Sequence, residues 1–289
     1  MITRIKRRKG PLILALCSLF WVKVTAQQLK IEESFFLSDS LHEISGLVYW
    51  KNHLIAHNDS GDQAILYVLN LRGEITKTVQ LRNATNRDWE DLALDEKTGT
   101  LFIGDIGNNG NQRKDLCIYR VSADSVIASK EVTAEKIRFR YADQQAYPPE
   151  NKDLHFDAEA MIYLNDSLWI FTKCRSKPYD GLSYVYKLSL ESDNQSAEVF
   201  QRLDLGGKRT NRHAVTGACK DGDKIFLLTY KGIFALKRDG GRSFAEEKYI
   251  KFKNWTQKEA IVHVENGFFL SDEKAPILGG GKLYRMRIK

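Results

Sequence analysis

Short runs of alternating apolar and polar residues, separated by turn-forming residues, recur along this chain. A small or acidic pair followed by alternating apolar residues occurs five times, at residues 45–49, 90–94, 159–163, 216–220 and 259–263. After each copy come a turn, a second apolar strand, a loop and a third strand. Almost no segment has helical periodicity. The chain is therefore predicted to be all-β and built from one repeated unit.

Most units also contain a fourth, more polar strand, as in ITKTVQLR, EKIRFRYA and AEVFQRLDL. Four short antiparallel strands per unit are typical of a β-propeller blade. The last unit ends at Lys289 after three strands, and residues 28–37 supply a spare strand before the first unit. Pairing the two would close the ring and remove its exposed edge. We expect a five-bladed β-propeller of four-stranded antiparallel blades closed by the N-terminal strand, with six blades as the alternative that length alone allows.

The first 26 residues have the order of a secretory signal peptide. Basic residues come first, then the apolar run at 11–22, then small residues before Gln27. The apolar run is shorter than the roughly 20 residues that a membrane-spanning helix needs. We expect cleavage after Ala26, export to the periplasm or the extracellular space, no transmembrane segment after cleavage, and a single propeller domain over residues 27–289.

The net charge of the chain lies mostly in that leader. The sequence has 44 Lys and Arg against 37 Asp and Glu, and the leader carries basic residues but no acid. The rest of the chain is close to neutral, so we expect no nucleic-acid partner. Cys117, Cys174 and Cys219 have no CxxC or Cys/His spacing of zinc type. Buried small apolar side chains are the simplest interpretation of these cysteines, and one disulfide is the alternative.

Acidic and amide side chains gather where the first strands begin and the second strands end. Because antiparallel neighbours reverse direction, both sets should lie at one end of the central channel. Close carboxylates either raise each other's pKa values or bind cations. With few His or Cys nearby, the set suits Ca²⁺, with Mg²⁺ as the alternative. Capping of turns would explain the same residues. The candidate metal ligands are Asp88, Glu90, Asp105, Glu159 and Glu259, and Asp59 and Asp157 belong to the same face.

Basic side chains are expected on the same face. Lys and Arg beside metal-binding carboxylates would suit an anionic ligand, such as a phosphate ester or an acidic sugar. Ordinary surface ion pairs are the alternative. The candidate ligand-binding residues are Asn108, Asn109, Arg113, Lys173, Arg175 and Asp272.

Histidine and aromatic residues add no catalytic motif. His57, His155 and His213 map near the acidic face, but no GxSxG or triad arrangement accompanies them. We expect hydrogen-bonded structural roles for them. Trp89 and Trp169 could stack on a sugar, but aromatic side chains between blades more often form the core.

Three motifs together resemble a group of exported bacterial propellers: DWEDLALD at 88–95, LFIGDIGNN at 101–109 and FDAEAMI at 156–162. The repeated strand starts are also similar to the SdiA-regulated family and, more distantly, to the phytase-like and SMP-30/gluconolactonase-like propellers. The resemblance covers most of the chain after the leader. It implies Ca²⁺ in or near the central channel and, for some relatives, hydrolysis of phosphate esters or lactones. Ser45 and Thr216 stand where the other units have Glu, so the ring of acids is incomplete.

Two hypotheses follow. In the first, a monomeric exported propeller binds a divalent metal and an anionic or carbohydrate-like small molecule on its acidic face, and acts as a metal-dependent hydrolase of phosphate esters or lactones. In the second, it is a non-catalytic binding or scaffold propeller at the cell surface or in the periplasm. Propellers host both kinds of function, so the fold alone does not decide whether this protein is an enzyme.

Overall fold

The computed structural model describes residues 29–206, 211–253, 256–265, 267–274 and 280–288. The signal peptide expected at residues 1–26 lies outside these ranges. The described chain is mostly strand, with one short helix, α1 (Ala123–Ala128), and the 3-10 turns η1 (Asp39–Leu41), η2 (Asn151–Asp153) and η3 (Asn211–His213). No described helix is long and apolar enough to cross a membrane. The prediction of an all-β fold is therefore confirmed.

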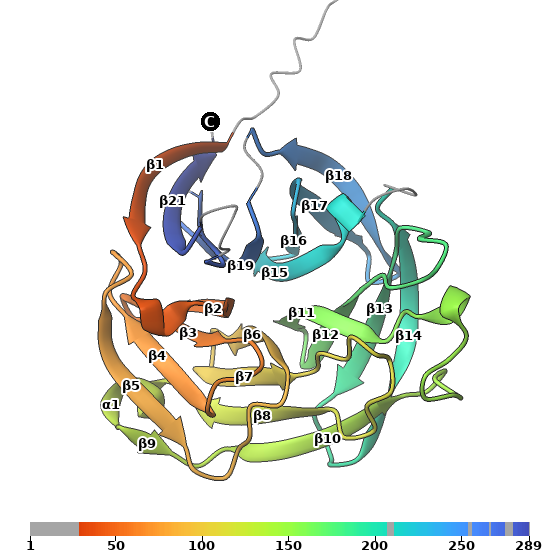
Figure 1. Cartoon of the computed structure of the whole chain (residues 1–289), viewed down its shortest axis with the longest axis horizontal. Helices are drawn as coiled ribbons and strands as arrows, with labels where there is room; N and C mark the ends of the chain where they lie inside the picture. Colours follow the sequence, from red (N-terminus) through yellow and green to blue (C-terminus); the bar gives the residue numbers. More distant parts are fainter. Residues whose placement is uncertain (1–28, 207–210, 254–255, 266, 275–279, 289) are drawn as a thin grey trace, which may run out of the picture.

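Hydrogen bonds group the described strands into four sheets (Figure 1). One holds β2 (Ile44–Trp50), β3 (His53–Asn58), β4 (Ile65–Leu69), β5 (Ile75–Leu81) and β9 (Glu131–Val132). The largest holds β6 (Trp89–Asp95), β7 (Thr100–Asp105), β8 (Cys117–Ser122), β10 (Glu135–Tyr141), β11 (Asp157–Leu164), β12 (Ser167–Lys173), β13 (Leu182–Ser189) and β14 (Gln195–Asp204). Another holds β15 (Val215–Asp221), β16 (Lys224–Thr229), β17 (Gly232–Asp239) and β18 (Ser243–Lys251). The last holds β19 (Lys258–Val264), β20 (Gly267–Asp272), β21 (Lys282–Ile288) and β1 (Leu29–Phe36).

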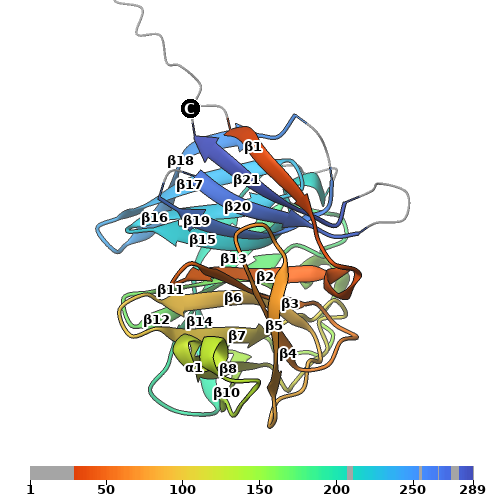
Figure 2. The same cartoon turned by 90° about the vertical axis from the view of Figure 1, so that its left-hand side faces the viewer.

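The largest sheet consists of two antiparallel runs, β6–β7–β8–β10 and β11–β12–β13–β14. Only their outermost strands join, through a short parallel pairing of β10 with β14 that begins at Phe139 and Gln195. A similar parallel pairing adds β9 to β5. Both strands lie beside α1 on the outer rim in Figure 1, and Figure 2 shows α1 from the side. In each run, as in the other sheets, four strands follow one another from the centre of the molecule to its rim.

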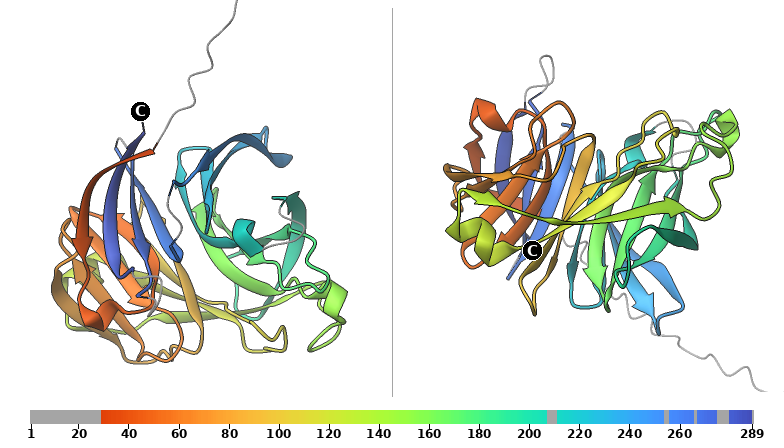
Figure 3. Two further views of the ribbon diagram at one scale, coloured as in Figure 1. Left: turned by 45° about the horizontal axis from the view of Figure 1, so that its top comes forward. Right: turned by 90° about the horizontal axis from the view of Figure 1, so that it is seen from below.

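The ring of sheets closes through the N-terminal strand. β1 pairs antiparallel with β21 from Leu29 opposite Ile288 to Phe36 opposite Lys282, and the two strands lie side by side in Figures 1 and 3. At the centre, β2, β6, β11, β15 and β19 each contact the next, and β19 contacts β2. This closed arrangement of radial antiparallel sheets is that of a β-propeller. The predicted role of the N-terminal strand is confirmed.

Turn residues explain where the inner hairpins reverse. Lys51 and Asn52 both have positive φ, 45° and 64°, between β2 and β3. Asn165 and Asp166, with φ of 51° and 58°, do the same between β11 and β12. Two-residue turns with positive φ at both positions match the twist of the flanking strands, and Asn and Asp tolerate that conformation better than most residues.

Large aromatic side chains fill the space between neighbouring sheets. The Trp169 ring packs edge-on against Phe244, with ring centroids 5.1 Å apart. The Trp89 ring meets His57 at 5.5 Å and is fully buried. These tryptophans are therefore core residues and offer no surface for a sugar. Cys117, Cys174 and Cys219 are buried free thiols.

Asp91 ties the inner strands together across the channel. Its carboxylate accepts the backbone N–H groups of Leu92 and Met161, each at 2.8 Å. Burial holds the pKa of Asp91 well above its ordinary value, and these backbone hydrogen bonds oppose the shift. The carboxyl group thus satisfies buried backbone donors on the neighbouring strands β6 and β11.

Asp91→Ala is expected to lower the free energy of unfolding by about 2–3 kcal/mol, because it leaves buried N–H groups unpaired. Urea denaturation would measure the loss. Glu246→Ala, on the exposed face of β18, is the control and should change stability by less than about 0.5 kcal/mol. Equal stability of the two variants would show that Asp91 does not join the strands.

Candidate functional site

Each inner strand carries a β-bulge within its first few residues. The register with the second strand shifts between Ile44 and Gly46 in β2 and between Trp89 and Asp91 in β6. Corresponding shifts occur in β11, β15 and β19. The residues within the five bulges are Ser45, Glu90, Glu159, Thr216 and Glu259. A bulge re-aims a side chain, so the repeated motif places one chosen side chain per inner strand at one end of the channel.

The two bulge residues that are not acidic join neighbouring sheets. The Ser45 hydroxyl donates to the backbone carbonyl of Glu90 at 2.5 Å. The Thr216 hydroxyl donates to the backbone carbonyl of Lys258 at 2.7 Å. The incomplete ring of acids therefore has a structural reason: these two positions bond to the next inner strand, and the other three present carboxylates.

Carboxylates from three sheet runs converge around Glu90. Oxygen atoms of Asp59, Asp88 and Glu90 lie within 4.8 Å of one another, and so do oxygen atoms of Glu90, Asp157 and Glu159. Glu90 is 3% exposed and Glu159 5%. We call these five residues the carboxylate cluster. Asp59 follows β3, Asp88 precedes β6, and the other three lie at the starts of β6 and β11.

Gly107 leaves room beside this cluster. A Cβ atom at Gly107 would lie 2.2 Å from Glu90 Oε1 and 2.5 Å from Asp88 Oδ2. The Gly107 N–H also donates to the backbone carbonyl of Asp88 at 3.1 Å. Any side chain at this position would occupy the space that the two carboxylates face, so the glycine of GDIGNN has a local steric reason.

Two cations neutralise one side of the cluster. Lys173 Nζ donates to Glu159 Oε2 at 2.8 Å. Arg175 Nε donates to Asp157 Oδ2 at 2.5 Å, and its Nη2 reaches Glu159 Oε1 at 3.1 Å. Arg175 Nη2 also donates to the side-chain carbonyl of Asn109. Glu259 is buried nearby, where the charge of Lys173 opposes the burial that raises its pKa.

The other side of the cluster has no such partner. Among the described residues, no ion pair involves Asp59, Asp88 or Glu90. Burial raises the pKa of Asp59 to about 7, and nearby carboxylates add to the shift. Burial and the charge of Asp59 raise the pKa of Asp88 to about 7. Burial, followed by the charges of Glu159 and Asp59, holds the pKa of Glu90 well above its ordinary value. Burial also raises the pKa of Glu159 to about 7, but there Lys173 and Arg175 oppose the shift, whereas at Asp88 only the more distant Arg113 does.

Asp105, another predicted ligand, bonds to an arginine instead. Arg113 Nη2 donates to Asp105 Oδ1 at 2.8 Å, and both side chains are almost fully buried. Asn108 holds the same loop: its side-chain carbonyl accepts the N–H groups of Gln112 and Arg113 at 2.8 and 2.9 Å. Asp105, Asn108 and Arg113 thus build the loop beside the carboxylate cluster, and a direct role in metal or ligand binding stays a prediction.

The Asp272 carboxylate also has hydrogen-bond and ion-pair partners within the protein. It accepts the Tyr284 hydroxyl at 2.9 Å and the Lys282 N–H at 3.0 Å, and Lys258 Nζ lies 3.7 Å from it.

The structure therefore brings Asp88, Glu90 and Glu159 together, with Lys173, Arg175 and Asn109 beside them. Asp59 and Asp157 complete the group. Both belong to the acidic face predicted from the sequence but are not among the candidate ligands, although HNDSGD and FDAEA contain the same pattern of acidic residues.

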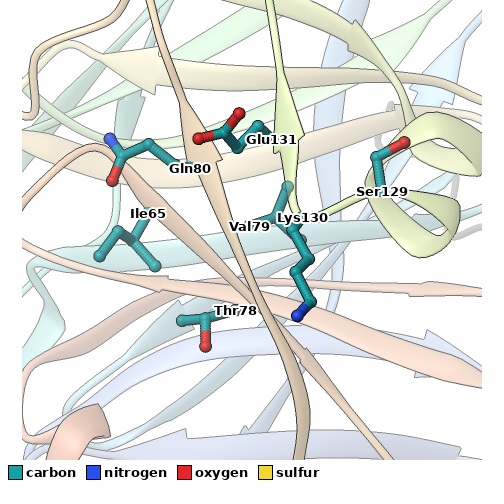
Figure 4. A pocket seen from close by; sticks show the side chains of 7 residues that line it. All are labelled: Ile65, Thr78, Val79, Gln80, Ser129, Lys130 and Glu131. Atoms are coloured by element: carbon teal, nitrogen blue, oxygen red, sulfur yellow. The ribbon is translucent and has the colours of Figure 1, made fainter.

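Two hollows of the described surface lie away from the carboxylate cluster. One of about 530 Å³ lies on the outer strands, lined by residues of β5 and of the segment leading into β9 (Figure 4). It is open, and its side chains form no cluster of metal-ligating groups. A hollow of about 70 Å³ lies at the far end of the channel, lined by later residues of all the inner strands, such as Leu94 and Tyr163. Glu96, Lys220 and His263 also line this hollow, but none of the described groups of potential metal ligands lies there.

Comparison with known proteins supports the fold. No family model and no curated protein matches this chain. Among solved structures, a glutaminyl cyclase from Myxococcus xanthus is 12% identical with a TM-score of 0.53, covering 91% of this chain and 98% of its own. The PQQ-bound form of an aldose sugar dehydrogenase from Streptomyces coelicolor is 7% identical with a TM-score of 0.55, at the same coverage. Both neighbours are propeller-like, and at these identities the likeness shows the fold alone.

Arg113→Met is expected to destabilise the protein by about 3–5 kcal/mol, because it leaves the buried Asp105 carboxylate without its cation. Asp105→Asn should cost less, since Arg113 keeps Asp115 at 3.2 Å and the Gly107 carbonyl at 2.7 Å. Urea denaturation of both variants would measure the difference. A larger loss in Asp105→Asn would mean that Asp105 has another partner, such as a metal ion.

Proposed function

We propose that this protein is an exported propeller that binds Ca²⁺ at the carboxylate cluster and an anionic or carbohydrate-like small molecule beside it. One observation carries the proposal. Asp59, Asp88 and Glu90 meet within 4.8 Å of one another, and no cation of the described chain pairs with any of them. Buried carboxylates in this arrangement either take up protons or bind a metal ion.

The donor set favours a hard cation. All three groups offer carboxylate oxygen, and the cluster contains no histidine or cysteine. Ca²⁺ takes oxygen ligands in flexible geometry at about 2.3–2.6 Å and fills its remaining positions with backbone carbonyls and water. Mg²⁺ is the alternative, but it demands near-octahedral geometry. Asp157 and Glu159 would then either supply further oxygen ligands to the same ion or remain paired with Arg175 and Lys173.

The cations beside the cluster support an anionic ligand. Arg175 keeps 32% of its side chain exposed, so part of its guanidinium can reach a molecule in solvent. Lys173 is buried, with its ammonium 5.5 Å from the Tyr230 ring centroid. A divalent ion supplies Lewis acidity and lowers the pKa of bound water. In a hydrolysis of phosphate esters or lactones, Arg175 and Lys173 would bind the negatively charged groups of the substrate. Glu90 or Glu159 would accept a proton from the attacking water.

The propeller neighbours include enzymes, which is compatible with a metal-dependent hydrolase. A non-catalytic binding or scaffold role at the cell surface or in the periplasm is the second candidate. The pairing of Lys173 with Glu159 and of Arg175 with Asp157 favours it, because neither cation is left without an acidic partner.

The architecture is proposed to have five blades, each with its inner strand at the channel. The contacts of β2, β6, β11, β15 and β19 in a closed ring support this number, as does the completion of the last sheet by β1. Export, with Ala26 as the last residue of the signal peptide, and a monomeric state remain part of the proposal.

Thermal unfolding in excess EDTA, then with Ca²⁺ or Mg²⁺ restored, tests metal binding. An ion at a hundredfold excess over its dissociation constant stabilises the fold by about 2.7 kcal/mol. Ca²⁺ should raise the midpoint by several degrees in the parent protein and in Glu246→Gln, the control. Glu90→Gln should lose this response, and its metal-free form should melt above the metal-free parent because repulsion within the cluster falls. No shift with either ion in the parent protein would contradict the proposal.

A panel of phosphate esters and lactones tests the enzymatic role. The parent protein should turn over at least one substrate class in Ca²⁺, and the double variant Glu90→Gln, Glu159→Gln should lose that turnover while keeping its circular dichroism spectrum. Arg175→Met should raise KM for an anionic substrate more than it lowers kcat, because it removes charge attraction. An inactive parent protein that still binds Ca²⁺ would favour the binding role.

A further inference from the structure

A second group of metal-ligating side chains lies outside the carboxylate cluster and shares no residue with it. His155 precedes β11, and Cys174 and Asp180 lie in the loop between β12 and β13. One ligand atom from each residue lies within 4.8 Å of the other two. The three groups are an imidazole, a thiol and a carboxylate, which together form a softer donor set than carboxylates alone.

The distances already approach those around a tetrahedral ion. His155 Nε2 lies 3.1 Å from Asp180 Oδ2, and Cys174 Sγ lies 3.1 Å from Asp180 Oδ1. Metal bonds of about 2.0–2.1 Å to nitrogen, 2.0–2.2 Å to oxygen and 2.3 Å to sulfur place tetrahedral ligands about 3.4–3.6 Å apart. An ion would therefore spread these two pairs by about 0.3–0.5 Å. The imidazole nitrogen and Cys174 Sγ lie within 4.8 Å of each other, so that pair would close by up to about 1.2 Å.

The two loops that carry these residues are tied together. The Arg175 N–H donates to the Leu154 carbonyl at 3.0 Å, and the Lys177 N–H donates to the Asn151 carbonyl at 2.8 Å. The His155 ring stacks on Tyr184, with centroids 4.4 Å apart and planes 9° from parallel. These contacts fix the positions of the ligand side chains in the absence of an ion. In known metal sites, the residues surrounding the ligands have the same effect.

Two hydrogen bonds close the loop around the thiol. The Asp180 N–H donates to Ser176 Oγ at 3.2 Å, and Ser176 Oγ donates to the Pro178 carbonyl at 3.0 Å. Ser176 Oγ also lies 3.1 Å from Cys174 Sγ. Cys174 and Asp180 are thereby kept on the same side of a short loop.

One ring nitrogen of His155 is buried without a hydrogen-bond partner among the described residues. His155 is only 2% exposed, yet its Nδ1 atom has no hydrogen-bond partner within the described part of the chain. The ring nitrogen that faces Asp180 is Nε2, so an ion among the three groups would bond to Nε2 and leave Nδ1 as it is. The grouping of the three ligand atoms, and not this unpaired nitrogen, is the observation that favours an ion.

We propose that His155, Cys174 and Asp180 bind a thiophilic divalent ion of the Zn²⁺ class, with the fourth position open to water or to an external ligand. The Asp180 side chain is 36% exposed, which leaves a path from solvent. On binding, the Cys174 thiol, which donates to Asp180 in the metal-free protein, releases its proton to solvent and forms the metal–sulfur bond. Three protein ligands with one open position are typical of catalytic zinc sites.

Co²⁺ is a suitable probe because its bond to a thiolate gives a near-ultraviolet charge-transfer absorption that carboxylates do not give. Protein treated with a chelator and kept reduced would be titrated with Co²⁺ in the presence of excess Ca²⁺. One equivalent of Co²⁺ should generate the band, and one equivalent of Zn²⁺ should remove it. The band requires a thiolate, and the carboxylate cluster contains no cysteine, so the signal does not depend on whether that cluster binds Ca²⁺. The excess Ca²⁺ serves only to compete with Co²⁺ for carboxylates.

Cys174→Ser is expected to eliminate the band. Asp180→Asn, which keeps the size of the side chain and lies partly at the surface, should weaken Zn²⁺ binding at least about tenfold. Cys117→Ser and Cys219→Ser are the matched controls and should keep both band and affinity, because those thiols are buried in other parts of the structure. Absence of the band in the parent protein, or its persistence in Cys174→Ser, would overturn the proposal. If Cys174→Ser does not fold, unchanged Zn²⁺ affinity in Asp180→Asn would overturn it instead.

Discussion

Repulsion among buried carboxylates at one end of the channel is the constraint on which this site depends. Two unit charges about 5 Å apart repel by about 3 kcal/mol at an effective dielectric constant of 20. Lys173 and Arg175 relieve this repulsion at Asp157 and Glu159. Within the described part of the chain no cation forms an ion pair with Asp59, Asp88 or Glu90, and only the charge of Arg113 acts on Asp88. The fold therefore tolerates a local cost that a bound cation would offset. Costs of this kind tend to be retained at functional sites.

The repeated unit explains how that constraint is built. A bulge near the start of every inner strand turns one side chain toward the end of the channel, and the residue chosen there decides its use. Glu90, Glu159 and Glu259 present charge, whereas Ser45 and Thr216 bond to the next inner strand. Equivalent positions of one repeat thus carry either an acidic side chain or a hydroxyl that joins neighbouring inner strands. Glycine at position 107 keeps the space beside Glu90 and Asp88 free.

Sequence patterns predicted the strands, the closing role of β1 and the convergence of acids, because alternation and antiparallel direction determine which end of a strand a residue occupies. They did not predict which acids already have partners. The pairing of Asp105 with Arg113 depends on how Asn108 folds the loop between β7 and β8. Similarly, His155 and Cys174 meet only because backbone hydrogen bonds join two loops. Such contacts have no periodicity. The sequence pattern also did not predict α1 and β9, which lie in the connection between the neighbouring strands β8 and β10.

The most direct test of the central claim is a crystal structure of the protein grown with Ca²⁺ and measured for anomalous scattering. The account predicts a peak between Asp59, Asp88 and Glu90, with carboxylate oxygens about 2.3–2.6 Å from the ion. A map with no peak there, in which these carboxyl groups share protons through direct hydrogen bonds, would contradict it.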